Sequence, residues 1–167
     1  MGKNSGGVRE SRPAYKKSLT SGEKIASVID DIKRDGYSKV EPFSIGRVEQ
    51  RMKDFAKENN IQIIGNSIYM RVKDISHTIR RSKKDKGISI TEAELVSFPK
   101  RRFKMDVYFD STDNSFIYVD KGMKAKYVIH TNYNVKTRDG VIVTSNYITA
   151  TRMKNFEELN LPKYKKV

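Results

Sequence analysis

The feature that most constrains the fold of this chain is a change in hydrophobic periodicity near Met105. Before that residue, apolar side chains recur every three or four positions, as they do along the buried side of a helix. After it, apolar and polar side chains alternate, which is typical of strands with one buried face. N-terminal helices followed by strands predict an α+β layer arrangement.

Two hairpins account for the strand half of the chain. Residues 107–109 and 116–119 flank the turn sequence DSTDNS, while residues 125–133 and 141–148 flank a second polar connection that ends at Gly140. Clusters of Asp, Asn, Ser and Gly between apolar runs are typical of turns. The sequence therefore predicts a four-stranded antiparallel sheet.

The chain divides into three parts by composition. Residues 1–19 combine glycine, serine and basic residues with few apolar ones, so we expect a flexible basic arm. Residues 20–60 are expected to form a helical segment that packs on the domain. Residues 61–167 are expected to form the α+β domain itself.

Local signals place the smaller elements. Thr20 and the glutamate three residues later form a capping box for a helix that ends at Gly36. A second helix is expected over 45–58. Residues 61–70 suggest a small hairpin or a sharp bend, and the residues from Arg152 onward an irregular or partly helical tail.

The chain is strongly basic, with 34 Lys and Arg against 20 Asp and Glu, a net charge of +14 and an isoelectric point near 9.9. In residues 71–104, eleven cationic side chains stand against four acidic ones, which is half of the net charge. Such a concentration points to a polyanionic partner, most often nucleic acid. An anionic membrane surface or an acidic protein is the alternative.

Several classes of protein are disfavoured by what the chain lacks. There is no cysteine, so disulfides and thiolate metal sites are excluded. No apolar run has the length of a secretion signal or a membrane span. We therefore expect a protein without a membrane span or a secretion signal, located in the cytoplasm.

The segment from Val72 to Lys84 has the strongest functional pattern. Its apolar residues fall on one side of a helix, and the other side collects an imidazole and three cations: Lys73, His77, Arg80 and Lys84. A titratable imidazole among fixed positive charges suits the handling of a phosphodiester. The alternative is a solvated basic face with a surface histidine.

Several short motifs follow one another in an order that resembles a known family. The first is a His-x-x-Arg-x-x-Lys helix, here His77, Arg80 and Lys83, and the second is a helix ending at proline, here Pro99. The third is a strand ending in Asn-Tyr, here Asn132 and Tyr133, and the last is a strand with Val-Thr-Ser, here Val143, Thr144 and Ser145. Over about residues 61–166 the succession is similar to phage-associated nuclease domains grouped with barnase, EndoU, colicin-type and RelE-like ribonucleases. The resemblance implies that family's fold, with a four-stranded antiparallel sheet, and RNA cleavage without a metal ion.

Such cleavage needs a base for the 2′-hydroxyl, cations for the phosphorane and an acid for the leaving 5′-oxygen. His77 is the natural base or acid. Arg80, with Lys83 or Lys126, could hold the non-bridging oxygens, and Thr144 could bind the phosphate or position water. The second acid or base stays open among His130, Tyr118 and Tyr147. The wider nucleic-acid-binding surface is expected from Lys73, Arg81, Lys84, Lys100, Arg101, Arg102 and Lys104.

No cofactor or metal ion is expected. Asp30 and Asp31 are adjacent on a helix and point in different directions, and Asp110 and Asp113 are explained by a turn. The expected partner is RNA or another nucleic acid, and the resemblance to phage-associated domains adds phage head proteins as a candidate partner and a virion as a candidate location. Two alternatives to a ribonuclease are a nucleic-acid-binding module that does not cleave and a structural or cargo protein of a virus-like particle.

Overall fold

The computed structural model describes residues 18–167, except for the side chains of residues 81 and 82. Of the basic arm expected over residues 1–19, residues 1–17 lie outside the described residues. The described chain begins just before α1, with exposed coil at residues 18–20.

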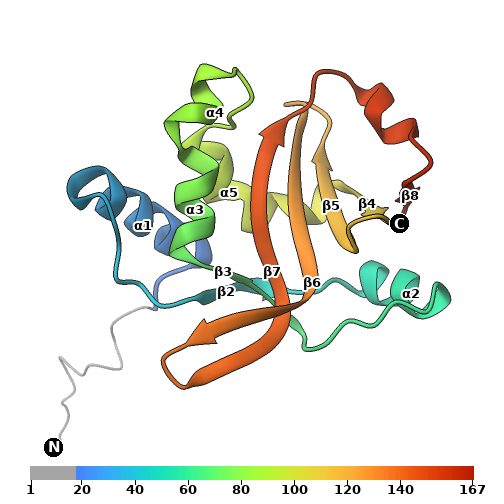
Figure 1. Cartoon of the computed structure of the whole chain (residues 1–167), viewed down its shortest axis with the longest axis horizontal. Helices are drawn as coiled ribbons and strands as arrows, with labels where there is room; N and C mark the ends of the chain where they lie inside the picture. The colour runs from blue at the N-terminus through green and yellow to red at the C-terminus, as the bar shows by residue number, and fades with distance from the viewer. Residues whose placement is uncertain (1–17) are drawn as a thin grey trace, which may run out of the picture.

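The first half of the described chain mixes helices with two short strands, and the second half consists largely of strands (Figure 1). The helices are α1 (Ser21–Asp35), α2 (Gln50–Glu58), α3 (Val72–Ile79), α4 (Arg81–Asp85), α5 (Glu92–Arg101) and the 3-10 turns η2 (Arg102–Lys104) and η3 (Phe156–Asn160). The strands are β2 (Phe43–Arg47), β3 (Ser67–Met70), β4 (Asp106–Asp110), β5 (Ser115–Asp120), β6 (Ala125–Thr137), β7 (Gly140–Arg152) and β8 (Tyr164–Lys166).

The strands form one seven-stranded mixed sheet in the order β2-β3-β7-β6-β5-β4-β8. All neighbours are antiparallel except β3 and β7, which run parallel. The predicted four-stranded antiparallel sheet, which the resemblance also implies, is therefore wrong. The two predicted hairpins are present as β4–β5 and β6–β7. The three additional strands, β2, β3 and β8, pair with segments distant in sequence, so no short turn next to them marks them as strands.

The capping box at the start of α1 is confirmed. The Glu23 amide donates to Thr20 Oγ1 at 3.1 Å, and the Thr20 amide donates to Glu23 Oε1 at 2.8 Å. Gly36 ends the helix in the left-handed conformation with φ 81°, which a residue with a Cβ adopts only at a cost.

The second predicted helix begins later than expected, because α2 starts at Gln50 and residues 43–47 form β2. Ile45 and Val48 are both buried, but one side chain comes from a strand and the other from the loop that follows it. Their spacing of three residues imitates a helical stripe. Local periodicity alone therefore assigns this segment incorrectly.

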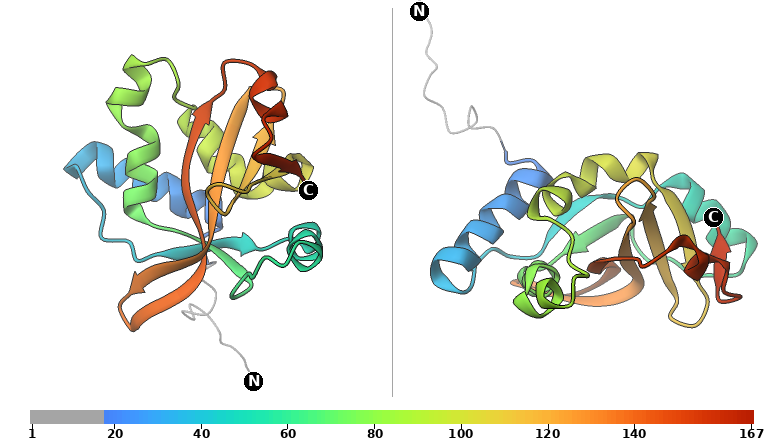
Figure 2. Two further views of the ribbon diagram at one scale, coloured as in Figure 1. Left: turned by 45° about the vertical axis from the view of Figure 1, so that its right-hand side comes forward. Right: turned by 90° about the horizontal axis from the view of Figure 1, so that it is seen from above.

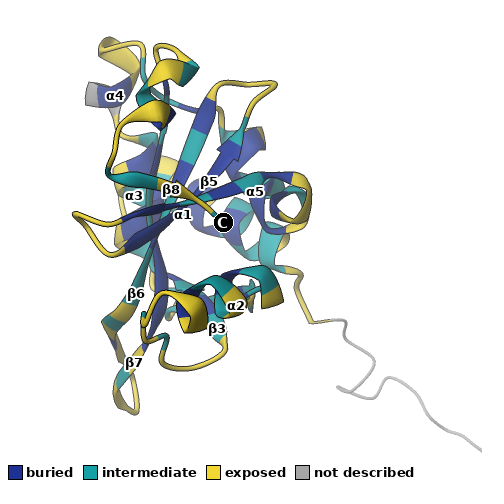
Figure 3. Ribbon diagram, turned by 90° about the vertical axis from the view of Figure 1, so that its right-hand side faces the viewer, coloured by how far each residue is buried: buried dark blue, intermediate teal, exposed yellow. Residues whose placement is uncertain are grey.

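The main core lies between the sheet and helices α1 and α5, which pack against each other (Figure 2). Phe98 of α5 stacks on Tyr127 of β6 with ring centroids 4.2 Å apart. A smaller cluster formed by Ile117, Val119, Met153 and Leu159 is covered by the C-terminal segment. Figure 3 shows that burial is concentrated in the strands and in the helix sides facing them.

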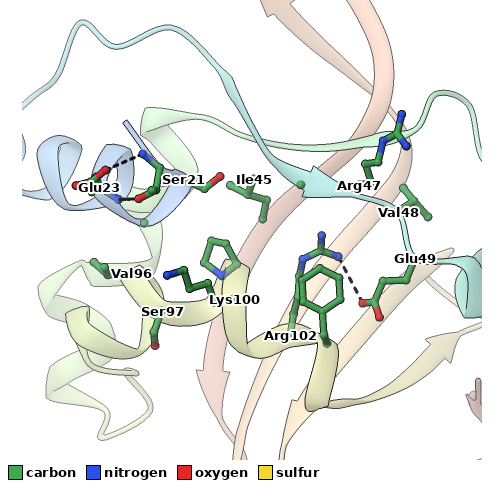
Figure 4. Close-up of a pocket in the computed structure, with 15 residues that line it drawn as sticks. Ser21, Glu23, Ile45, Arg47, Val48, Glu49, Val96, Ser97, Lys100 and Arg102 are labelled. Atoms are coloured by element: carbon green, nitrogen blue, oxygen red, sulfur yellow. Dashed lines mark hydrogen bonds and ion pairs between the residues drawn. The ribbon is translucent and has the colours of Figure 1, made fainter. Parts of the chain in front are cut away.

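Arg102, predicted to bind nucleic acid, is instead a core residue that is 1% exposed. Its Nη1 donates to Glu49 Oε2 at 3.4 Å (Figure 4) and to Tyr118 Oη at 3.1 Å. The Tyr118 hydroxyl donates to the same carboxylate. Gly46 makes room for this guanidinium, because a Cβ at that position would overlap it. Arg102 therefore stabilises the fold through contacts with Tyr118 and Glu49.

We expect Arg102→Met to lower the free energy of unfolding by about 2 kcal/mol, because it removes the buried cation from the Tyr118 hydroxyl and leaves the Glu49 carboxylate with Arg51 as its ion-pair partner. Urea denaturation followed by circular dichroism measures the change. The control is Lys104→Met on the exposed side of η2, which should change the value by less than about 0.5 kcal/mol. Equal free energies of unfolding for the two variants would contradict the conclusion that Arg102 stabilises the fold.

Candidate active site

The helix predicted around His77 is broken into two. α3 ends at Ile79, Arg80 has an extended backbone with φ −62° and ψ 150°, and α4 begins at the next residue. The break reorients the residues that follow it. Lys83 is buried against the sheet, and Lys84, expected on the His77 face of a continuous helix, is exposed on α4.

His77 lies at the surface and accepts a hydrogen bond from Arg80. Arg80 Nη1 is 2.9 Å from His77 Nδ1, and both side chains are exposed. A guanidinium has only donors, so Nδ1 carries no proton and the proton of the neutral ring is on Nε2. Partial desolvation, followed by the positive charges of Lys83 and Arg80, lowers the pKa of His77 below its ordinary value of 6.5. The ring is therefore mainly neutral at pH 7.

Lys83 is the buried member of this group, with only 3% of its surface exposed. Its Nζ donates to the carbonyl oxygen of Ala150 at 3.0 Å and to the hydroxyl of Thr149. Desolvation, with a contribution from Arg80, lowers the pKa of Lys83 from 10.5 to about 8. The ammonium is therefore mostly charged at pH 7, but it loses its proton at a pH only slightly higher.

The contacts of Lys83 satisfy an edge of β7 that has no neighbouring strand. β7 pairs with β6 on one side, but on the other side it pairs with β3 only at Ser145 and Asn146. Farther along that edge, Ala150 accepts from Lys83, and the Arg152 amide donates to the carbonyl of Ile88 at 2.8 Å. α4 and the segment after it thus cover this part of β7 (Figure 1).

A buried polar network fixes the first turn of α3 to the sheet. Asp74, 4% exposed, accepts from Arg71 Nη2 at 2.7 Å and from Asn146 Nδ2 at 3.0 Å. Arg71 Nη2 also donates to Tyr133 Oη at 3.2 Å. The network positions the helix that carries His77. The resemblance pointed to Tyr133, but Asp74 and Asn146 gave no signal, because single polar residues in a helix or a strand are usually solvated.

Two of the three candidates for the second acid or base are unsuitable. Tyr118 and Tyr147 are both fully buried, and burial raises the pKa of each phenol well above its ordinary range. Tyr147 is also engaged with Thr78 at 2.7 Å. His130 is partly exposed, and its Nε2 lies 3.0 Å from Asp113 Oδ2. Of the three, His130 alone is accessible to a substrate.

Two further predicted residues are committed to other contacts. Lys126 forms an ion pair with Glu158 in η3. Thr144 is 4% exposed, and its hydroxyl donates to the carbonyl of Ser67 at 2.7 Å, which helps hold β3 beside β7. The structure therefore brings His77, Arg80 and Lys83 together without these two residues.

Two of the nucleic-acid-binding residues predicted around α3 and α4 are at the surface. Lys73 and Lys84 are exposed, and the side chain of Arg81 lies outside the described part of the chain. Lys73 lies one turn before His77 on α3, and Lys84 lies on α4, so both helices carry an exposed positive charge.

The predicted binding residues near α5 lie in a different part of the molecule, because α5 passes behind the strands while α3 and α4 lie beside them (Figure 1). Lys104 is exposed, and Lys100 is exposed at a mostly apolar groove of about 720 Å³ between α1, β2 and α5 (Figure 4). Arg101 is partly buried in an ion pair with Asp120. With Arg102 in the core, the basic sequence run does not form one continuous surface.

Among residues 18–167, apart from the side chains left out at 81 and 82, no group of three or more His, Asp or Glu side chains could hold a metal ion. None of the described helices has the length and apolar character needed to cross a lipid bilayer. Comparisons with protein-family models, with curated proteins and with solved structures find no match to this chain. The resemblance to phage-associated nuclease domains stays a prediction that depends on the short motifs.

Proposed function

We propose that this chain binds RNA and cleaves it without a metal ion, by attack of the 2′-hydroxyl on the adjacent phosphate. The observation that supports the proposal is the arrangement around His77. An exposed, neutral imidazole is hydrogen-bonded to one cation and lies in the field of a second whose pKa is about 8. Groups that titrate near neutral pH beside fixed positive charge suit acid–base chemistry on a phosphodiester.

Arg80 controls the availability of the base in this proposal. In the free protein its guanidinium occupies His77 Nδ1, the ring nitrogen that has the lone pair. A phosphate group competes for the same guanidinium and offers a charge-assisted bond in its place. When Arg80 moves to the non-bridging oxygens, Nδ1 becomes free to accept the proton of the 2′-hydroxyl.

The remaining steps use the same few groups. The 2′-oxygen forms a bond to phosphorus as the bond to the 5′-oxygen breaks, giving a 2′,3′-cyclic phosphate and a 5′-hydroxyl. The proton taken up by His77 is then available for the leaving oxygen. Lys83, held by Thr149 and Ala150, stabilises the negative charge that develops and does not itself transfer a proton.

A second candidate function is nucleic-acid binding without cleavage. It is favoured by the positions of the predicted helpers, since Thr144, Tyr118 and Tyr147 are buried and Lys126 is paired with Glu158. A structural or cargo protein of a virion, associated with phage head proteins, would likewise bind nucleic acid without cleaving it. The basic surface around α3 serves either function.

The first test is cleavage of labelled single-stranded RNA in excess chelator. We expect 2′,3′-cyclic or 3′-phosphate ends, and we expect His77→Ala to lower the rate by about 10²-fold or more while RNA binding persists. Lys165→Gln, a change on the exposed edge strand β8, serves as the matched control and should cleave normally. Products with 3′-hydroxyl ends, or full activity of His77→Ala, would reject the mechanism and favour the binding function.

The pH dependence of kcat/KM gives a second test. The rate should rise with pH until His77 loses its proton, at a pKa below 6.5, and should fall above pH 8 as Lys83 becomes neutral. Lys83→Arg keeps a positive charge throughout this range, so a folded Lys83→Arg protein should lose the alkaline decline. An alkaline decline that is unchanged in this variant would remove Lys83 from the mechanism.

A further inference from the structure

A groove of about 810 Å³ lies beside the first turn of α3. It is bounded by the C-terminal end of α1, the connection that follows it, α3 and the outer part of β6. Its ionisable lining consists of four cationic side chains, one carboxylate and one phenol: Lys39, Arg71, Lys73, Lys136, Glu41 and Tyr37.

The positive charge of the groove is largely unneutralised. Arg71 is paired with Asp74, but Lys39, Lys73 and Lys136 are exposed and form no ion pair within the described part of the chain. The Glu41 carboxylate accepts from the backbone amide of Arg138 at 3.0 Å. Three ammonium groups around the groove form a site for a ligand with several negative charges.

An aromatic ring stands among these cations. Tyr37 follows the glycine that ends α1, lines the groove and is 57% exposed. Cationic side chains that hold a phosphate backbone, combined with an exposed ring on which a base can stack, are the two components of single-stranded nucleic-acid sites.

The groove is continuous with the surface around His77. Lys73 and Ser76 line it, and Lys73 precedes His77 by four residues on the same helix, about 6 Å along the helix axis. A strand with one phosphate at His77 and Arg80 therefore reaches the groove with its neighbouring nucleotides.

We propose that this groove binds single-stranded RNA next to the scissile phosphate, with one base stacked on Tyr37 and the backbone held by Lys39, Lys73 and Lys136. The inference rests on the proposed function and adds the substrate class and its path. A duplex keeps its bases stacked inside the helix and cannot offer one to Tyr37, so single strands are expected to bind better.

The test measures binding by fluorescence anisotropy in the His77→Ala background, which separates binding from cleavage. The probes are a labelled single-stranded RNA of ten nucleotides and the same sequence in a duplex. Tyr37→Ala should weaken binding of the single strand by about fivefold or more, whereas Tyr37→Phe, which keeps the ring, should bind like its parent. Lys136→Gln should reduce the slope of log K against log salt by about 0.7, and Lys165→Gln on β8 should leave it unchanged.

Equal affinities of Tyr37→Ala and Tyr37→Phe, or tighter binding of the duplex, would overturn the groove assignment. If the chain with His77 cleaves RNA and Tyr37→Ala changes neither binding nor kcat/KM, the groove is refuted and the catalytic proposal survives. If it binds single strands through Tyr37 but does not cleave, the catalytic proposal is refuted and the groove survives. Absence of binding to either probe would overturn both.

Discussion

The arrangement of this protein depends on how the free edge of β7 is satisfied. β7 has β3 beside it only over two residues, so the rest of that edge exposes backbone groups that need partners. The Lys83 ammonium and the Ile88 carbonyl supply them. The helix stops at Ile79 with the extended residue Arg80 at the break, and Lys83 on the helix that follows reaches this edge. The same constraint therefore buries a cation and places a guanidinium beside His77.

This placement explains the electrostatic character of the site. A solvent-exposed lysine would stay charged over the whole physiological range, but burial against β7 brings the pKa of Lys83 to about 8. The imidazole is also disfavoured as a cation, because it is partly desolvated and has two positive neighbours, Lys83 and Arg80. The polar network of Asp74 with Asn146 holds α3 in position. The unusual titration properties thus follow from satisfying the edge of a strand, which is a folding requirement.

Local sequence patterns correctly predicted the elements whose contacts are short-range. The capping box at Thr20 and the two hairpins depend on residues close in sequence, and both are confirmed. The parallel pairing of β3 with β7 and the strand at Ile45 depend on contacts between distant segments, and no local pattern encodes them. The same limit applies to the cations: Arg102 and Lys83 look like surface charges in the sequence, and only the tertiary positions of their acceptors show that they are buried.

The central claim is that His77 is a neutral imidazole at pH 7 whose Nδ1 lone pair is held by Arg80. Long-range ¹H–¹⁵N correlation spectra of the imidazole rings, recorded across a pH titration, measure both the tautomer and the pKa of this histidine. The account predicts an unprotonated Nδ1, a protonated Nε2 and a midpoint below 6.5. A neutral ring with its proton on Nδ1, or a midpoint at or above 6.5, would contradict it.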